Sequence, residues 1–64
     1  MENNLIKYLE QMEKEVLLAC QDSEKFGEGN NSAGTRVRKY MQSIKKLAQE
    51  VRVEVQDQKH AVVA

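Results

Sequence analysis

The stretch Gly27-Glu28-Gly29-Asn30-Asn31-Ser32 decides how this 64-residue chain folds. Glycine tolerates the positive φ that commonly ends a helix, and asparagine and serine are typical of turns and of helix N-caps. The stretch therefore predicts that one helix ends here and that a second helix begins, with Asn31 or Ser32 as its cap. The chain contains no proline, so no further break of that kind is expected on either side.

Apolar and small residues before this stretch recur at alternating steps of four and three, which places them on one side of a helix. The same spacing resumes after the stretch, with Met41, Ala48 and Val55 along its flank. Two such helices joined by a short turn fold back antiparallel, because each buries its stripe against the other. The stripes consist of Leu5, Leu9, Met12, Val16, Ala19, Ser23 and Phe26, and of Ala33, Val37, Tyr40, Ile44, Leu47 and Val51.

The fold predicted from this pattern is all-α, a single antiparallel, coiled-coil-like hairpin over residues 1–64. We expect a helix over about 3–26, the turn over 27–32 and a second helix over about 32–57. Residues 58–64 are expected to form a loose tail, because β-branched residues weaken the end of the second helix and chain termini fray.

A chain of this length buries little apolar surface, so it usually depends on disulfides, a metal or self-association. Cys20 is the single cysteine; it cannot form an intramolecular disulfide, and we interpret it as a small buried apolar residue. His60 beside one cysteine is no metal-binding set, so neither a metal nor another cofactor is expected. We therefore expect homodimerisation into a four-helix bundle, which would cover the apolar flanks of the hairpin.

Neither catalysis nor membrane insertion is expected. No nucleophile, base and orienting group converge, because His60 lies near the loose end and the carboxylates lie on solvated helix faces. The longest apolar run, from Val16 to Cys20, is far shorter than the roughly 20 residues of a membrane span. The N-terminus is acidic and polar, unlike a signal sequence. We expect a cytoplasmic protein without a small-molecule substrate.

The net charge of the chain is zero, but its two halves are opposite in sign. Residues 1–31 hold three basic and seven acidic side chains, a sum of −4, and residues 32–64 hold seven basic and three acidic ones, a sum of +4. Between Arg36 and Lys46 there are five basic residues and no acidic residue. The asymmetry makes the second helix the candidate for contact with an anionic partner.

The basic residues of the second helix are expected to form two ridges. Arg38, Lys45 and Arg52 lie seven residues apart on one shoulder of the apolar face, and Lys39 and Lys46 lie on the back. Such ridges can follow a phosphate backbone, since neutralising phosphates releases their counterions and drives sequence-independent binding. The alternative is that these are ordinary solvated residues, or that they pair along the helix or with acidic residues of the first helix.

The start of the second helix is another candidate anion site. Unpaired backbone amides at a positive helix end suit a phosphate. Plain N-capping by Asn31 or Ser32 is the alternative, and the two readings can coexist. The residues concerned are Asn30, Asn31, Ser32, Gly34 and Thr35, with Arg36, Arg38 and Lys39 directly behind them.

Two stretches carry a resemblance to a known family: residues 29–39 read Gly-Asn-Asn-Ser-Ala-Gly-Thr-Arg-Val-Arg-Lys, and residues 44–52 read Ile-Lys-Lys-Leu-Ala-Gln-Glu-Val-Arg. They resemble the amino-terminal domain of the bacterial linker-histone-like proteins of the chlamydial type. That family shows a comparable Gly-Asn-Lys-Ser/Ala-Ala pattern, an Arg-x-Arg and a Lys-Leu-x-Lys-like run, and Asn31 stands where a Lys is common. The layout is similar over roughly residues 5–56.

The resemblance implies a histone-like, nucleoid-associated protein that binds duplex DNA non-specifically and helps to compact it. Family members carry a Lys/Ala-rich tail that this sequence lacks, so we expect weak, salt-dependent binding per hairpin, which a dimer would strengthen. The alternative is a coiled-coil module that pairs with another protein and binds no nucleic acid. The candidate DNA-binding residues are Asn30, Ser32, Thr35, Arg36, Arg38, Lys39, Lys45, Lys46 and Arg52.

Overall fold

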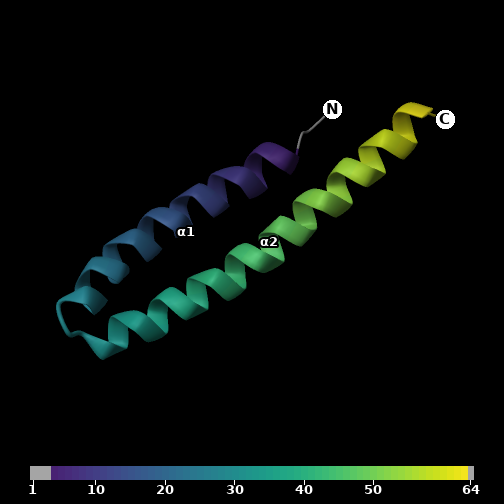
Figure 1. Ribbon diagram of the computed structural model, residues 1–64. Helices are drawn as coiled ribbons and strands as arrows, with labels where there is room; N and C mark the ends of the chain where they lie inside the picture. Colours follow the sequence, from purple (N-terminus) through teal and green to yellow (C-terminus); the bar gives the residue numbers. More distant parts are fainter. Residues whose placement is uncertain (1–3, 64) are drawn as a thin grey trace.

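The computed structural model describes residues 4–63, with the side chains of residues 4–59. Helix α1 runs over Asn4–Gly27 and helix α2 over Asn31–Val63. The two helices pack side by side and antiparallel, and the molecule is a rod with extents of 54 × 16 × 11 Å (Figure 1). The predicted all-α hairpin is confirmed.

The turn is built from backbone hydrogen bonds around Gly29. The N–H of Gly29 donates to the carbonyl of Phe26 at 3.0 Å, and the N–H of Asn30 donates to the carbonyl of Lys25 at 3.0 Å. These two bonds form a Schellman motif, which places a left-handed residue at the position that Gly29 occupies. The φ angle of Gly29 is 103°, so a residue without a side chain is needed there.

Asn30 ends the turn and caps α2. Its side-chain oxygen Oδ1 accepts a hydrogen bond from the N–H of Ala33 at 3.1 Å, which satisfies one of the unpaired donors of the first helical turn. The cap is therefore Asn30, one residue before Asn31 and two before Ser32, the two predicted candidates.

The face of α1 that packs on α2 is displaced from the predicted stripe. Leu9 and Val16 were expected to face α2, but they are 48% and 47% exposed. The residues immediately before them, Tyr8 and Glu15, are half-buried instead, and Asp22 is 6% exposed. Apolar periodicity identified the side of α1 that carries the most apolar residues. It did not identify which residues of α1 contact α2, because polar side chains supply much of that contact.

Two polar contacts across the hairpin account for this displacement. The Nη2 atom of Arg36 lies 2.9 Å from Oδ1 of Asp22, and Nε of Arg36 donates to the same oxygen at 3.0 Å. Further from the turn, the Ser43 hydroxyl donates to Oε1 of Glu15 at 2.6 Å. The partners of each contact stand at equal distances from Gly29, seven positions in the first contact and fourteen in the second. A shift of one helix along the other would break both contacts.

Few apolar side chains are buried within the hairpin. Among the described side chains, the buried apolar ones are those of Ala19 and Ala33, and no large side chain is fully buried. Cys20 is exposed, contrary to our interpretation of it as buried, because it lies on a flank of α1 turned away from α2. The large apolar side chains left exposed are those of Ile6, Leu9, Val16, Leu17, Phe26, Met41, Val53 and Val55.

Helix α2 is longer than predicted. It continues to Val63 through residues 58–63, which were assigned to a loose tail; Ala64 lies outside the described residues. No glycine or proline follows Gly34 to end the helix, and β-branched residues lower helix propensity by less than about 0.7 kcal/mol each. With 33 residues against 24 in α1, α2 projects beyond the beginning of α1 (Figure 1).

Candidate nucleic-acid interface

Exposed cations line α2 in two rows, which run along the side of this helix away from α1. The shoulder row consists of Arg38, Lys45 and Arg52, and the back row consists of Lys39 and Lys46; all five side chains are exposed. Because each heptad step covers about 10.5 Å of helix, the shoulder row is about 21 Å long. The helix thus presents cations at regular intervals along its length.

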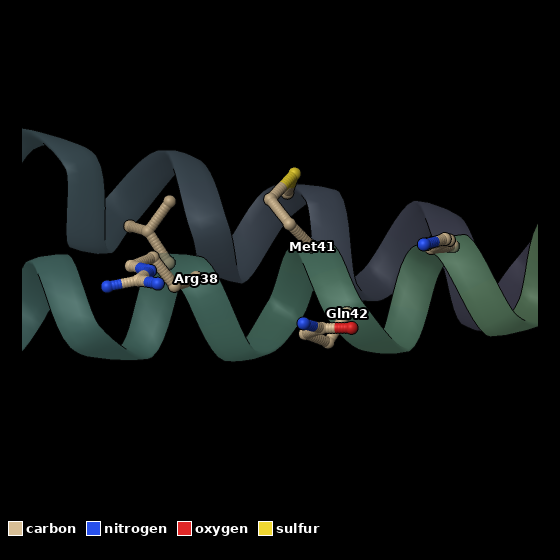
Figure 2. A pocket seen from close by; sticks show the side chains of 5 residues that line it. Arg38, Met41 and Gln42 are labelled. Carbon is tan, nitrogen blue, oxygen red and sulfur yellow. The ribbon is translucent and has the colours of Figure 1, made fainter.

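Neutral amides separate the two rows. Gln42 and Gln49 line a groove of about 400 Å³ together with Lys45 of the shoulder row and Lys46 of the back row. A second groove, lined by Val37, Arg38, Met41, Gln42 and Lys45, follows the other side of the shoulder row (Figure 2). Amide groups between cations can donate further hydrogen bonds to phosphate oxygens.

The cations of the two rows are not engaged by acidic side chains. Within the described part of the chain, no carboxylate lies within 4.0 Å of any of them. Lys46 and Glu50 have the four-residue spacing that permits pairing along a helix, yet they form no ion pair among the described contacts. The positive charge of both rows therefore faces solvent.

Arg36 is placed apart from the rows, at the contact between the helices. Its side chain is 42% exposed and that of Asp22 is 9% exposed. The hydrogen bond that Arg36 donates lowers the pKa of the Asp22 carboxyl below its usual value of 3.8, against the opposing effect of burial. The same bond raises the pKa of the Arg36 guanidinium. Arg36 therefore pairs with an acidic residue of the first helix, which is the alternative to a free cation.

The residues at the beginning of α2 lie close to one end of the shoulder row. Asn30, Ser32 and Thr35 are all exposed, although Oδ1 of Asn30 is engaged as the helix cap. Thr35 and Arg38 line one groove, of about 410 Å³. The predicted anion site and the predicted shoulder ridge are therefore continuous on the surface.

Two features of this end of the hairpin were missed by the sequence reasoning. One is the identity of the Asp22–Arg36 pair: pairing of basic residues with the first helix was an open alternative, but these two partners are indicated only by their equal distance from Gly29. The other is the packing of the Phe26 ring on Gly34, where a Cβ atom would lie 2.6 Å from Cδ1 of the ring. Gly34 therefore serves close packing, in addition to any part it has in the anion site.

The residues that the structure describes contain no cluster of three or more His, Cys, Asp or Glu side chains suited to a metal ion. Neither helix, over its described length, is apolar enough to span a lipid bilayer.

The model of the family described as histone H1-like protein Hc1 matches residues 5–61, which include both helices and the turn. No curated protein and no solved structure matches the chain.

Proposed function

Because the chain belongs to the family of histone H1-like protein Hc1, we propose that α2 binds the phosphate backbone of duplex DNA without reading base sequence. Membership of this family implies a DNA-binding, DNA-compacting role and an architectural, non-enzymatic protein. The binding mode rests on the two cation rows: five exposed, unpaired cations of one helix can each neutralise a phosphate and release its counterion.

The proposed interface extends from the beginning of α2 to Arg52. Asn30, Ser32 and Thr35 add hydrogen-bond donors where the helix N-terminus carries partial positive charge. Arg36 contributes the electrostatic field of its charge rather than a direct phosphate contact, because its guanidinium is paired with Asp22. The phosphate contacts themselves come from the shoulder and back rows, Arg38, Lys39, Lys45, Lys46 and Arg52.

Self-association is part of the proposed function. A homodimer that forms a four-helix bundle would bury the apolar side chains that the single hairpin leaves exposed. It would also present the cation rows twice, and linked sites bind a polyanion far more tightly than separate ones. Two interfaces on one particle provide the means of holding two DNA segments, as compaction within a nucleoid requires.

The test is the salt dependence of DNA binding, measured by fluorescence anisotropy on a labelled duplex between about 50 and 200 mM salt. The variant Lys39→Gln/Lys46→Gln removes the back row. Since each phosphate contact contributes about 0.9 to the slope of log affinity against log salt, the slope should decrease by about 2.

The matched control is Lys7→Gln/Lys14→Gln, which removes two exposed lysines that are also seven residues apart but lie on α1. The control should keep the slope of the parent protein. An equal decrease in both variants would contradict an interface on α2. Absence of binding at 50 mM salt and micromolar protein would contradict the function and favour a module that pairs with another protein.

A further inference from the structure

Exposed apolar side chains of both helices gather on one side of the hairpin. At 100° per residue, Leu9 and Val16 occupy the shoulder of α1 beside its contact with α2, and Met41 occupies the shoulder of α2 on the same side. Ile6 and Leu17 lie on the back of α1, away from α2. Each is about half exposed. We call the side that these shoulders share the apolar face; it consists of Leu9, Val16, Phe26 and Met41.

Contacts near the turn place the two shoulders on the same side. The Phe26 ring of α1 packs directly on Gly34 of α2. One groove is lined by Ser23 and Phe26 from α1 and by Gly34 and Val37 from α2. Ser23 continues the heptad row of Val16, so the surface around this groove leads directly onto the apolar face.

The apolar face is acidic on the α1 side and basic on the α2 side. Glu13 is exposed and lies at the outer edge of the apolar face, between Leu9 and Ile6 around α1. Lys45 of the shoulder row is exposed and lines a groove with Met41. Both charged residues are sixteen positions from Gly29, so both lie about 24 Å from the turn at 1.5 Å per residue.

We propose that a second copy of this chain covers the apolar face, related to the first by a two-fold axis parallel to the helices. This axis sets α1 of one copy against α2 of the other, with both turns at the same end. Glu13 of each copy then lies level with Lys45 of the other copy, at the rim of the interface. The inference rests on the proposed homodimer and adds the geometry of its interface.

The charge pattern selects this geometry over the alternative two-fold axis. An axis perpendicular to the helices would set α1 against α1 and α2 against α2. Glu13 would then face an acidic edge and Lys45 a basic one, and like charges at a partly desolvated rim are repulsive. The hairpin needs further apolar burial for stability, because its buried apolar side chains among the described residues are two alanines.

The test is a charge-reversal mixing experiment read by sedimentation equilibrium on the full chain. In Glu13→Lys alone, and in Lys45→Glu alone, the proposed dimer brings like charges together at both rims, and its dissociation constant should rise about tenfold. An equimolar mixture of the two variants restores opposite charges at both rims and should dimerise as the parent does. Lys46→Glu, which makes the same charge change on the back row, is the matched control and should dimerise like the parent.

A spin-label distance checks the orientation independently. With a nitroxide on Glu28→Cys in a Cys20→Ser background, the proposed axis predicts a separation within about 20 Å, the width of two helices. The perpendicular axis predicts at least about 36 Å, the length of α1. A spin-label distance of about 36 Å or more, or a mixture that dimerises no more tightly than either variant alone, would overturn the proposed geometry. A parent protein that stays monomeric at every concentration tested would overturn the proposal that a second copy covers the apolar face.

The same variants separate this inference from the DNA-binding proposal. Glu13→Lys/Lys45→Glu in one chain should dimerise normally but bind DNA more weakly, because one cation of the shoulder row is reversed. If the parent dimerises with the expected distance but binds no DNA, the proposed function fails and the geometry stands. If it binds DNA as a monomer, the geometry fails and the phosphate contacts stand.

Discussion

The two ends of the hairpin are held together in different ways. At the turn end, the Schellman bonds around Gly29, the Asn30 cap and the Asp22–Arg36 pair are directional contacts with definite partners. At the open end, side chains such as Tyr8 and Val51 are only half-buried, and α2 continues past the beginning of α1.

This difference indicates where the register of the two helices is specified. Half-buried apolar contacts tolerate small displacements, whereas a hydrogen bond weakens steeply as its partners separate or tilt. The turn end therefore fixes how α1 and α2 align, and the open end follows that alignment. Substitutions at the turn end, paired with matched substitutions elsewhere in the hairpin, test this difference between the two ends.

The largest effect is expected from Ala33→Leu. Ala33 is 0% exposed, so a larger side chain must force the helices apart, at a cost of about 1–3 kcal/mol. Ala48→Leu, at a half-buried position further from the turn, should cost much less. Thermal unfolding followed by circular dichroism measures both variants; equal losses would mean that the two ends are packed alike.

A smaller loss is expected from Gly29→Ala. An alanine at a φ of 103° is strained by about 1–2 kcal/mol. Gly27→Ala is the matched control, because Gly27 is helical and a Cβ there meets nothing within 4 Å. The control should stabilise the hairpin by up to about 1 kcal/mol. Urea unfolding gives the free energy of unfolding of both variants. If Gly29→Ala stabilised the hairpin, the turn would not be what fixes the register of the helices.

The smallest effect is expected from Asp22→Asn; it is present near neutral pH and disappears in acid. Because the pKa of Asp22 is lowered in the folded protein, its pair with Arg36 contributes stability fully above the usual pKa of 3.8 and loses it as the pH falls through the lowered pKa. Arg36 is partly exposed, so solvent screens the pair and limits its contribution.

Unfolding midpoints measured between about pH 6 and pH 2 should therefore decrease less in Asp22→Asn than in the parent. Glu24→Gln, two residues away at an exposed position, removes a carboxylate without removing the pair and should keep the parent's pH dependence. Parallel curves for Asp22→Asn and the parent would show that the pair does not stabilise the turn end.

The hairpin itself was predictable because the six residues from Gly27 to Ser32 have strong turn and capping preferences, and because helical periodicity resumes after them. The residues of α1 that contact α2 were not predictable, since apolar periodicity identifies only the side of a helix with the most apolar residues. Here Glu15 and Asp22 displace Val16 from the contact because Ser43 and Arg36 stand opposite them. Such pairing between distant positions becomes visible only once the register is known.

The candidate interface was predictable to a similar extent. Heptad spacing placed Arg38, Lys45 and Arg52 in one row, and the helix keeps them exposed. Arg36 belongs to the same cluster of charge in the sequence, but its side chain reaches a buried carboxylate. The spacing of residues along the sequence determines the side of the helix on which each side chain lies. Its partner on another helix depends on the tertiary fold.

The symmetry of the contacts about Gly29 has a kinetic consequence. Fourteen residues separate Asp22 from Arg36, and 28 separate Glu15 from Ser43. The entropy lost in closing a loop grows with its length, so contacts near the turn form first and the hairpin closes outward, as a zipper does. Substitutions near Gly29 should slow folding, and those near the open end should mainly accelerate unfolding.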